Sequence, residues 1–312
     1  MKKIFFAAIA LVALASCAKE EFVSVNRQAI SFGEAFVDNA TRADYSVAGN
    51  LKEFYVYGTA SGTMQGGGTV NIFDGDKVTG TVGNNVWNCT ETQYWIPGAN
   101  YAFAAVVDAT VEAPASNNGM PTTLTTIADD ATTGNMYLKD MLYAEATVDG
   151  DDVTVDYDTP VNFTFQHLLS KVHFTVTSTA QGDYSHKVTG IKVYNYSEGT
   201  YTIDGGTWNV NGDPVVAVTF ADIAGVSSTN GGVSNADMLL VPTAATYNVT
   251  FTVELYKGTT KLGTETKTIP VEKDLLKGNA YNFTIACSVG NPIQFKVTND
   301  PTWGTQPDVT IQ

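Results

Sequence analysis

The chain has 312 residues, enough for two domains of roughly 150 residues each. Its 32 acidic and 17 basic residues give a formal net charge of −15, and such a chain lacks the clusters of lysine and arginine that bind nucleic acid. Only 16% of the residues are charged, whereas tyrosine and phenylalanine number fifteen each. This composition is typical of antiparallel sheet and predicts an all-β protein with no nucleic-acid partner.

The first 17 residues have the layout of a bacterial export signal. Lys2 and Lys3 precede an apolar run, residues 4–14, which is too short to cross a bilayer as a helix. The run leads into Leu-Ala-Ser-Cys, ending at Cys17, and this sequence resembles the lipobox of bacterial lipoproteins. The resemblance implies that residues 1–17 form a lipoprotein signal peptide whose cysteine carries the lipid anchor in the outer membrane. The alternative is an ordinary secretory signal with an accidental cysteine.

Residues 18–45 are interpreted as a tether followed by a removable first strand. The Lys-Glu-Glu sequence soon after the lipobox cysteine resembles a surface-export signal of some Bacteroidota lipoproteins, and the alternative is a solvated tether. Residues 29–37 then alternate between apolar and polar side chains, which predicts a strand with Ile30 and Phe32 on one face.

Residues 159–177 lie at the middle of the chain and contain two alternating segments. Apolar residues occupy every second position on both sides of a break, at Val161, Phe163, Phe165, Val172, Phe174 and Val176. This period of two is typical of half-buried strands. The sequence His-Leu-Leu-Ser interrupts it, so we predict a short turn or a single helical turn at which one sandwich passes into the next. His167 is interpreted as a hydrogen-bonded residue at this junction rather than a metal ligand.

Further strands are predicted from the same alternation and from the turn-forming residues between the runs. They cover residues 51–58, 71–81, 84–87, 101–105, 187–196, 215–220, 247–256, 261–271 and 276–285, and residues 201–210 are predicted to form a hairpin about the Gly-Gly pair at 205–206. Residues 109–136 are polar and aperiodic, and we interpret them as a loop with one short strand or helical turn. The two domains are placed at residues 46–165 and 166–312.

Several motifs, taken in order, resemble the fimbrillin family, the lipoprotein subunits of the type V pili of Bacteroidales. The mid-chain run of that family, aromatic-x-His-hydrophobic-x-Ser-Lys, is matched by Phe165, His167, Leu168, Ser170 and Lys171. The other matches are the Tyr-Trp-hydrophobic-Pro-Gly turn at 94–98, the apolar run closing on proline at 238–242, the strand at 281–285 and the terminal Trp303. No single motif is specific, but their order spans nearly the whole chain.

The resemblance implies two tandem transthyretin-like Greek-key β-sandwiches in a structural or adhesive pilus subunit. In the family, a trypsin-like protease trims the N-terminus, and the Thr-Arg-Ala sequence at Arg42 and Ala43 matches that site. Cleavage would remove the strand that carries Ile30 and Phe32 and expose a groove, which a neighbouring subunit fills by strand addition. The candidate donor is either residues 293–297, with Ile293, Phe295 and Val297, or residues 309–312. The implied partners are other pilus subunits, the membrane through the lipid anchor, and a host glycan or protein receptor.

The main alternative function is a surface glycan-binding lipoprotein of a polysaccharide-uptake system, with exposed tryptophan or tyrosine as sugar platforms. The chain contains no GxSxG, HExxH or CxxC sequence, so no enzymatic activity, metal or cofactor is predicted. The acidic residues within 149–158 fit no EF-hand spacing and are interpreted as a hairpin, with calcium binding left open. Cys89 and Cys287 fall in different expected domains and are interpreted as unpaired, with a disulfide left open.

Overall fold

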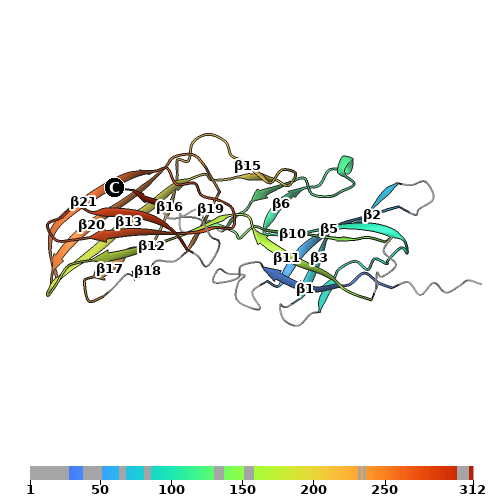
Figure 1. The fold of residues 1–312 in the computed structure, drawn as a ribbon, viewed down its shortest axis with the longest axis horizontal. Helices are drawn as coiled ribbons and strands as arrows, with labels where there is room; N and C mark the ends of the chain where they lie inside the picture. The colour runs from blue at the N-terminus through green and yellow to red at the C-terminus, as the bar shows by residue number, and fades with distance from the viewer. Residues whose placement is uncertain are drawn as a thin grey trace, which may run out of the picture.

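Figure 1 shows the fold of the chain as a computed structural model, in which strands make up nearly all of the regular structure. The structure describes residues 28–37, 51–62, 68–80, 86–129, 137–150, 158–230, 233–234, 237–300 and 309–311. The prediction of an all-β protein is confirmed, since the one helix within these ranges is a single 3-10 turn, η1 (Ala115–Asn117). Within the same part of the chain, no helix is long and apolar enough to cross a membrane.

Seven strands at one end of the molecule close into the N-terminal barrel (Figure 1). They are β1 (Phe32–Val37), β2 (Glu53–Gly62), β3 (Thr69–Gly80), β4 (Trp87–Cys89), β5 (Ala99–Val107), β10 (Leu142–Val148) and β11 (Val161–His167), in the order β1-β11-β10-β5-β2-β3-β4. The predicted central strand is confirmed, because Tyr101, Phe103 and Ala105 are all buried on β5 between β2 and β10. The strands form a closed barrel rather than an open sandwich because β1 pairs with both β11 and β4.

Two sheets at the other end pack face to face as the C-terminal sandwich (Figure 1). The first contains β12 (Ser170–Ser178), β18 (Val233–Ser234), β19 (Met238–Leu240), β22 (Ala280–Cys287), β23 (Gln294–Asp300) and β24 (Val309–Ile311). The second contains β13 (Tyr184–Asn195), β16 (Val216–Thr219), β17 (Ile223–Val226), β20 (Tyr247–Lys257) and β21 (Thr260–Val271). The two sheets share one core, in which Phe251 of β20 stacks on Phe295 of β23 with ring centroids 6.0 Å apart.

A third, four-stranded sheet joins the two ends of the molecule. It contains β6 (Ala109–Glu112), β7 (Thr123–Thr126), β14 (Thr200–Thr202) and β15 (Thr207–Asn209), in the order β15-β14-β7-β6. Our interpretation of residues 109–136 as a loop is therefore wrong for β6, β7 and the short β8 (Ala128–Asp129), which pairs with β9 (Tyr137–Leu138). The signal was absent because β7 finds its partner β14 far along the chain, where the hydroxyls of Thr125 and Thr200 lie 3.1 Å apart.

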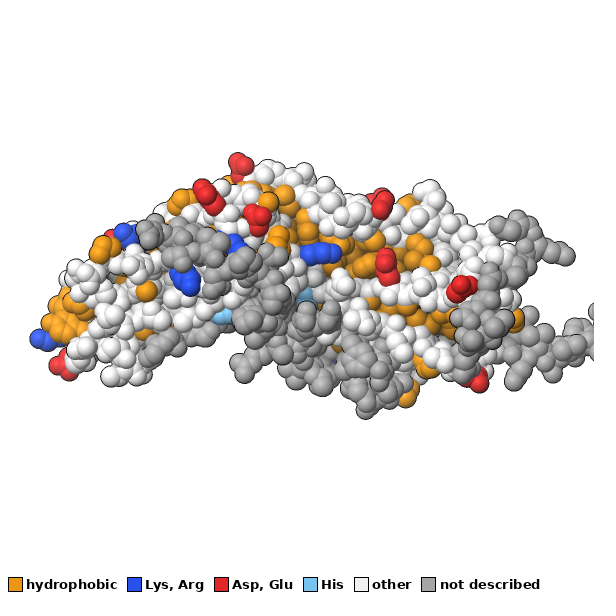
Figure 2. Space-filling view, in the orientation of Figure 1, with side chains coloured by type: hydrophobic (Ala, Val, Ile, Leu, Met, Phe, Trp, Pro, Cys, Tyr) orange, Lys and Arg blue, Asp and Glu red, His pale blue; other side chains and the backbone are white. Residues whose placement is uncertain are grey.

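A separate apolar core lies beneath this joining sheet. Its buried members come from both halves of the chain: Val106, Leu124, Leu138, Met141, Leu168, Leu169, Tyr196, Tyr201 and Val241. His167 and Asp140 lie beside it, with Nδ1 of the histidine 2.9 Å from Oδ1 of the aspartate and both side chains at most 3% exposed. Our interpretation of His167 as a hydrogen-bonded residue is confirmed. Figure 2 shows hydrophobic side chains gathered over the middle of this face, while acidic side chains are spread singly across it.

Asn195 forms the most completely buried polar contact of the junction. Its side-chain NH2 donates to the carbonyl oxygen of Val241 at 3.1 Å, and its Oδ1 accepts from the N–H of the same residue at 2.9 Å. Asn195 is 0% exposed. We expect Asn195→Ala to lower the free energy of unfolding by about 2–4 kcal/mol, because both backbone groups of Val241 would lose their partner away from water.

Urea unfolding of the variant tests this expectation. The control is Asn209→Ala, since the Asn209 side chain donates to the Thr202 hydroxyl in an exposed position, where a substitution changes the unfolding free energy by about 0.5 kcal/mol or less. Equal effects of the two substitutions would show that the Asn195 contact does not hold the junction together.

The two cysteines left open by the sequence are both free thiols. Cys89 lies in the N-terminal barrel and Cys287 in the C-terminal sandwich. Burial raises the pKa of the Cys287 thiol to about 12 and also raises the pKa of Cys89. Both thiols are therefore protonated at neutral pH, and a protonated thiol is a poor nucleophile.

Candidate functional site

Residues 28–37, the plug segment, close the N-terminal barrel. At its start, the N–H of Ile30 donates to the carbonyl of Gln93 at 2.8 Å, and the N–H of Trp95 donates to the carbonyl of Gln28 at 3.0 Å. Further along, β1 runs parallel to β11, and the N–H of Val161 donates to the carbonyl of Ser31 at 2.8 Å. The segment is thus held by two different parts of the barrel (Figure 1).

The apolar side chains of the plug segment complete the barrel core. Ile30, Phe32, Ala35 and Val37 are 3–8% exposed, which confirms the face predicted for Ile30 and Phe32. The ring of Phe32 lies against four others, with centroid distances of 6.2 Å to Phe54, 5.6 Å to Phe73, 6.5 Å to Phe103 and 5.9 Å to Phe163. Full burial of Ile30 and of Phe32 stabilises the fold by roughly 1.5–3 kcal/mol each, so removing the segment would expose a large apolar groove.

The backbone pairing of β1 with its two neighbouring strands is short on one side and irregular on the other. Against β4 there is a single residue pair, Phe32 with Trp87. Against β11 the register shifts between Phe32 and Ala35, and parallel pairing is slightly less stable per residue than antiparallel pairing. Gly33 leaves no room for a side chain, since a Cβ there would clash with Oδ1 of Asn162. The core contacts therefore hold β1 more strongly than its ladders do.

The residues predicted for processing lie outside the described residues. They are Cys17, Arg42 and Ala43, and the acidic residues 151–157 of the expected hairpin lie outside as well. The positions of the arginines in the sequence nevertheless bear on processing. The chain has two arginines, Arg27 and Arg42, and they flank the plug segment on its two sides. A protease specific for arginine thus has one site that leaves the plug attached to the rest of the chain and one that separates it.

The structure distinguishes between the two candidate donor segments. Residues 294–300 form β23, which pairs with β22 over seven residue pairs and with β24 on its other side. Phe295 and Val297 are 4% and 0% exposed in the core of the sandwich, and Ile293 packs against that core. By contrast, β24 lies at the end of the strand order and pairs with β23 alone. Both segments alternate between apolar and polar residues, so the sequence alone does not tell which strand is an inner strand. The strand order in the sheet shows that β23 is an inner strand and β24 an edge strand.

The tryptophans expected as sugar platforms in the alternative function are mostly in the core. Trp87 and Trp95 are 5% and 6% exposed inside the N-terminal barrel. Trp208 is half-buried on β15, against the core beneath the joining sheet. Trp303 lies outside the described residues. Among the residues that the structure places, no group of three or more His, Cys, Asp or Glu side chains is arranged to hold a metal ion.

Solved structures share the fold over almost the whole chain. A fimbrial protein from Bacteroides vulgatus is 14% identical with a TM-score of 0.61, and the match covers 87% of this chain and 98% of that one. A protein from Bacteroides ovatus assigned to cell adhesion is 17% identical with a TM-score of 0.53, covering 92% and 99% of the two chains. A third, from Bacteroides uniformis and also assigned to cell adhesion, is 18% identical with a TM-score of 0.51, covering 88% and 97%.

No curated protein sequence matches the chain, and at identities this low the solved structures establish the fold alone. A match to the sequence pattern of a family, by contrast, shows family membership. The fimbrillin-like family pattern matches residues 41–301, which include β2 to β23 of the barrel, the joining sheet and the sandwich. The chain therefore belongs to the fimbrillin-like family.

Proposed function

We propose that this protein is a fimbrial subunit that reaches the cell surface as a lipoprotein and polymerises there by strand exchange. The observation that carries the proposal is the plug segment. It fills the barrel core with Phe32 and Ile30, and it closes the barrel through short stretches of strand pairing. In the sequence it is followed by Arg42. A segment that a single cut can detach, and whose loss exposes an apolar groove, is suited to assembly by strand addition.

Before cleavage, the plug segment keeps the subunit closed. An open sheet edge beside an apolar groove would pair with other chains during export, and β1 prevents this by occupying the position between β11 and β4. After a cut following Arg42, β1 and the lipid-bearing N-terminus belong to a separate peptide. The groove can then bind a strand from another subunit in place of β1.

The C-terminal segment at β24 is the donor that we propose. Donation of β23 would pull Phe295 and Val297 out of the subunit's own sandwich core. Release of β24 breaks its three residue pairs with β23 and leaves Phe295 and Val297 in place on β23. In the groove, an antiparallel donor would form a more regular ladder with β11 than β1 does, since β1 is parallel and its register shifts.

Negative-stain electron microscopy of the trimmed protein tests this function. Filaments support a polymerising subunit, whereas persistent monomers would contradict it and favour a subunit that anchors a fimbrium without being trimmed. The burial of Trp87 and Trp95 supports the fimbrial function over the glycan-binding alternative, because a sugar platform has to be exposed.

Replacing Cys17 with alanine is expected to move the protein from the membrane fraction to the soluble fraction. In this proposal the acyl chains on Cys17 are the anchor, and each buried CH2 group contributes about 0.8 kcal/mol to membrane binding. Cell fractionation followed by immunoblotting measures the shift. The control is Ser16→Ala, which keeps the cysteine and leaves a small residue before it. Retention of the Cys17→Ala variant in washed membranes would contradict a lipid anchor at this position.

A further inference from the structure

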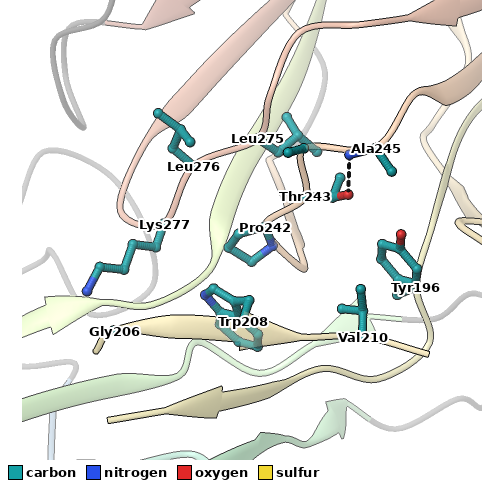
Figure 3. A pocket seen from close by; sticks show the side chains of 11 residues that line it. Tyr196, Gly206, Trp208, Val210, Pro242, Thr243, Ala245, Leu275, Leu276 and Lys277 are labelled. Carbon is teal, nitrogen blue, oxygen red and sulfur yellow. Dashed lines mark hydrogen bonds between the residues drawn. The ribbon is translucent and has the colours of Figure 1, made fainter. Parts of the chain in front are cut away.

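A pocket of about 420 Å³ lies where the joining sheet meets the C-terminal sandwich (Figure 3). Four separate segments build it: Tyr196 after β13, the hairpin of β14 and β15, residues 242–245 after β19, and residues 275–277 before β22. Its volume falls within the range of about 300–1,000 Å³ that is typical of small-molecule sites. Because β1 lies in the N-terminal barrel, this pocket is independent of the proposed assembly mechanism.

The walls of the pocket are largely apolar. Trp208 and Val210 form one side and Pro242, Leu275 and Leu276 the other, as Figure 3 shows. Such walls bind a ligand by removing its apolar surface from water. Sugar hydroxyls need polar side chains for their hydrogen bonds, yet the residues that line this pocket include no Asn, Gln, Asp or Glu. The lining therefore favours an apolar body over a carbohydrate.

One end of the pocket carries a positive charge that is held in place. The ammonium of Lys277 donates to the hydroxyl of Tyr201 at 2.6 Å and lies 4.8 Å from the centroid of the same ring. The lysine side chain is exposed at the rim, so its remaining N–H groups can reach a ligand. No acidic residue lines the pocket, although the chain has 32 acidic residues and only 17 basic ones.

The indole ring of Trp208 lies near this end. Its Nε1 is buried and has no hydrogen-bond partner within the described structure. In Figure 3 this nitrogen is on the side of the indole that faces Lys277. Because that nitrogen is enclosed by protein atoms, a ligand in the pocket would meet the carbon atoms of the ring, and Trp208 contributes apolar surface. The pocket thus offers apolar walls and one ammonium group, with no carboxylate among its lining residues to balance the charge.

We propose that this pocket binds a small amphipathic carboxylate, that is, an apolar body bearing one carboxylate group. The apolar body would pack between Trp208 and the Pro242–Leu276 side, and the carboxylate would pair with Lys277. A charge-assisted hydrogen bond of this kind is stronger than a neutral one. Since Tyr201 already fixes the ammonium in place, little side-chain freedom is lost on binding.

Isothermal titration calorimetry of the full-length Cys17→Ala protein, which lacks the proposed lipid anchor and so needs no detergent, with octanoate and octanamide as probes, tests the proposal. The two probes share the same chain and differ in the charge of the head group. We expect octanoate to bind roughly tenfold more tightly, the ratio that corresponds to one charge-assisted hydrogen bond. Lys277→Gln should abolish the difference, and Trp208→Phe, which keeps an aromatic ring but reduces its apolar area, should weaken the binding of both probes to the same extent.

Lys257→Gln is the matched control. The Lys257 ammonium also lies over a tyrosine ring, 5.6 Å from the centroid of Tyr184, but it does not line this pocket. Its removal should leave octanoate binding unchanged. Equal binding of the two probes, no binding of octanoate, or an equal loss with Lys257→Gln and Lys277→Gln would overturn the proposal. Self-association that Lys277→Gln abolishes would also overturn it, because the occupant would then be a second copy of the chain.

Discussion

Replacing Phe32 with alanine is expected to lower the unfolding free energy of the uncleaved chain by about 3–5 kcal/mol, the range for a fully buried phenylalanine. Phe32 is 3% exposed and touches four other phenylalanine rings in the N-terminal barrel. The cavity would open in the middle of that cluster, which is built from strands on all sides and has little room to collapse. Urea denaturation followed by tryptophan fluorescence measures the loss, since Trp87 and Trp95 lie in the same core.

Tyr55→Ala is the control for this variant. Tyr55 is also an aromatic residue of the barrel, but it is 41% exposed on the outer face of β2, so its removal should change the unfolding free energy by less than about 1 kcal/mol. If Phe32→Ala does not fold, Phe32→Leu keeps most of the apolar volume and gives a smaller loss, on the order of 1 kcal/mol. Were the Phe32 variants as stable as Tyr55→Ala, the plug segment would not be completing the core.

Alternation in the sequence predicted the parts of the fold that are half-buried. On β5 and β11, side chains at every second position enter the barrel core, and the pattern therefore records which face is inside. On the plug segment the buried positions move from Ile30 and Phe32 to Ala35 and Val37, because the register shifts between Phe32 and Ala35. The break at residues 168–169 was equally readable, because β11 belongs to the barrel and β12 to the sandwich. Such patterns involve residues that are close together in the chain, so they can be recognised in a single sequence.

Pairings between distant segments left no such signal. The partners β7 and β14 are short threonine-rich strands whose contact, Thr125 with Thr200, joins residues 75 positions apart. Closure of the barrel similarly depends on β1 finding β11, which is distant in the sequence. The pocket beside Trp208 is assembled from four segments, so its chemistry becomes visible only after folding. For the same reason, alternation could not show that β23 is an inner strand and β24 an edge strand.

Arg42→Ala is expected to prevent assembly entirely, whereas Arg27→Ala is expected to permit it. These are the two arginines of the chain, and an arginine-specific protease can cut after each. A cut after Arg27 removes the lipid anchor but leaves the plug segment joined to the rest of the chain. A cut after Arg42 makes β1 a separate peptide, held only by its core contacts and short ladders. Of the two variants, therefore, only the Arg27→Ala protein, which keeps Arg42, can lose β1 and expose the groove.

Protease treatment of the two variants, followed by N-terminal sequencing and size-exclusion chromatography, measures the difference. The Arg42→Ala protein should yield a monomer that starts at Gln28, and the Arg27→Ala protein should yield oligomers of a fragment that starts at Ala43. Deleting residues 309–312 from the Arg27→Ala chain should leave the cut intact but stop oligomer formation, because the donor strand is then missing. Oligomers from the Arg42→Ala protein would show that the groove is not the assembly site. Oligomers from the shortened chain would show that the donor lies elsewhere, since β24 would be dispensable.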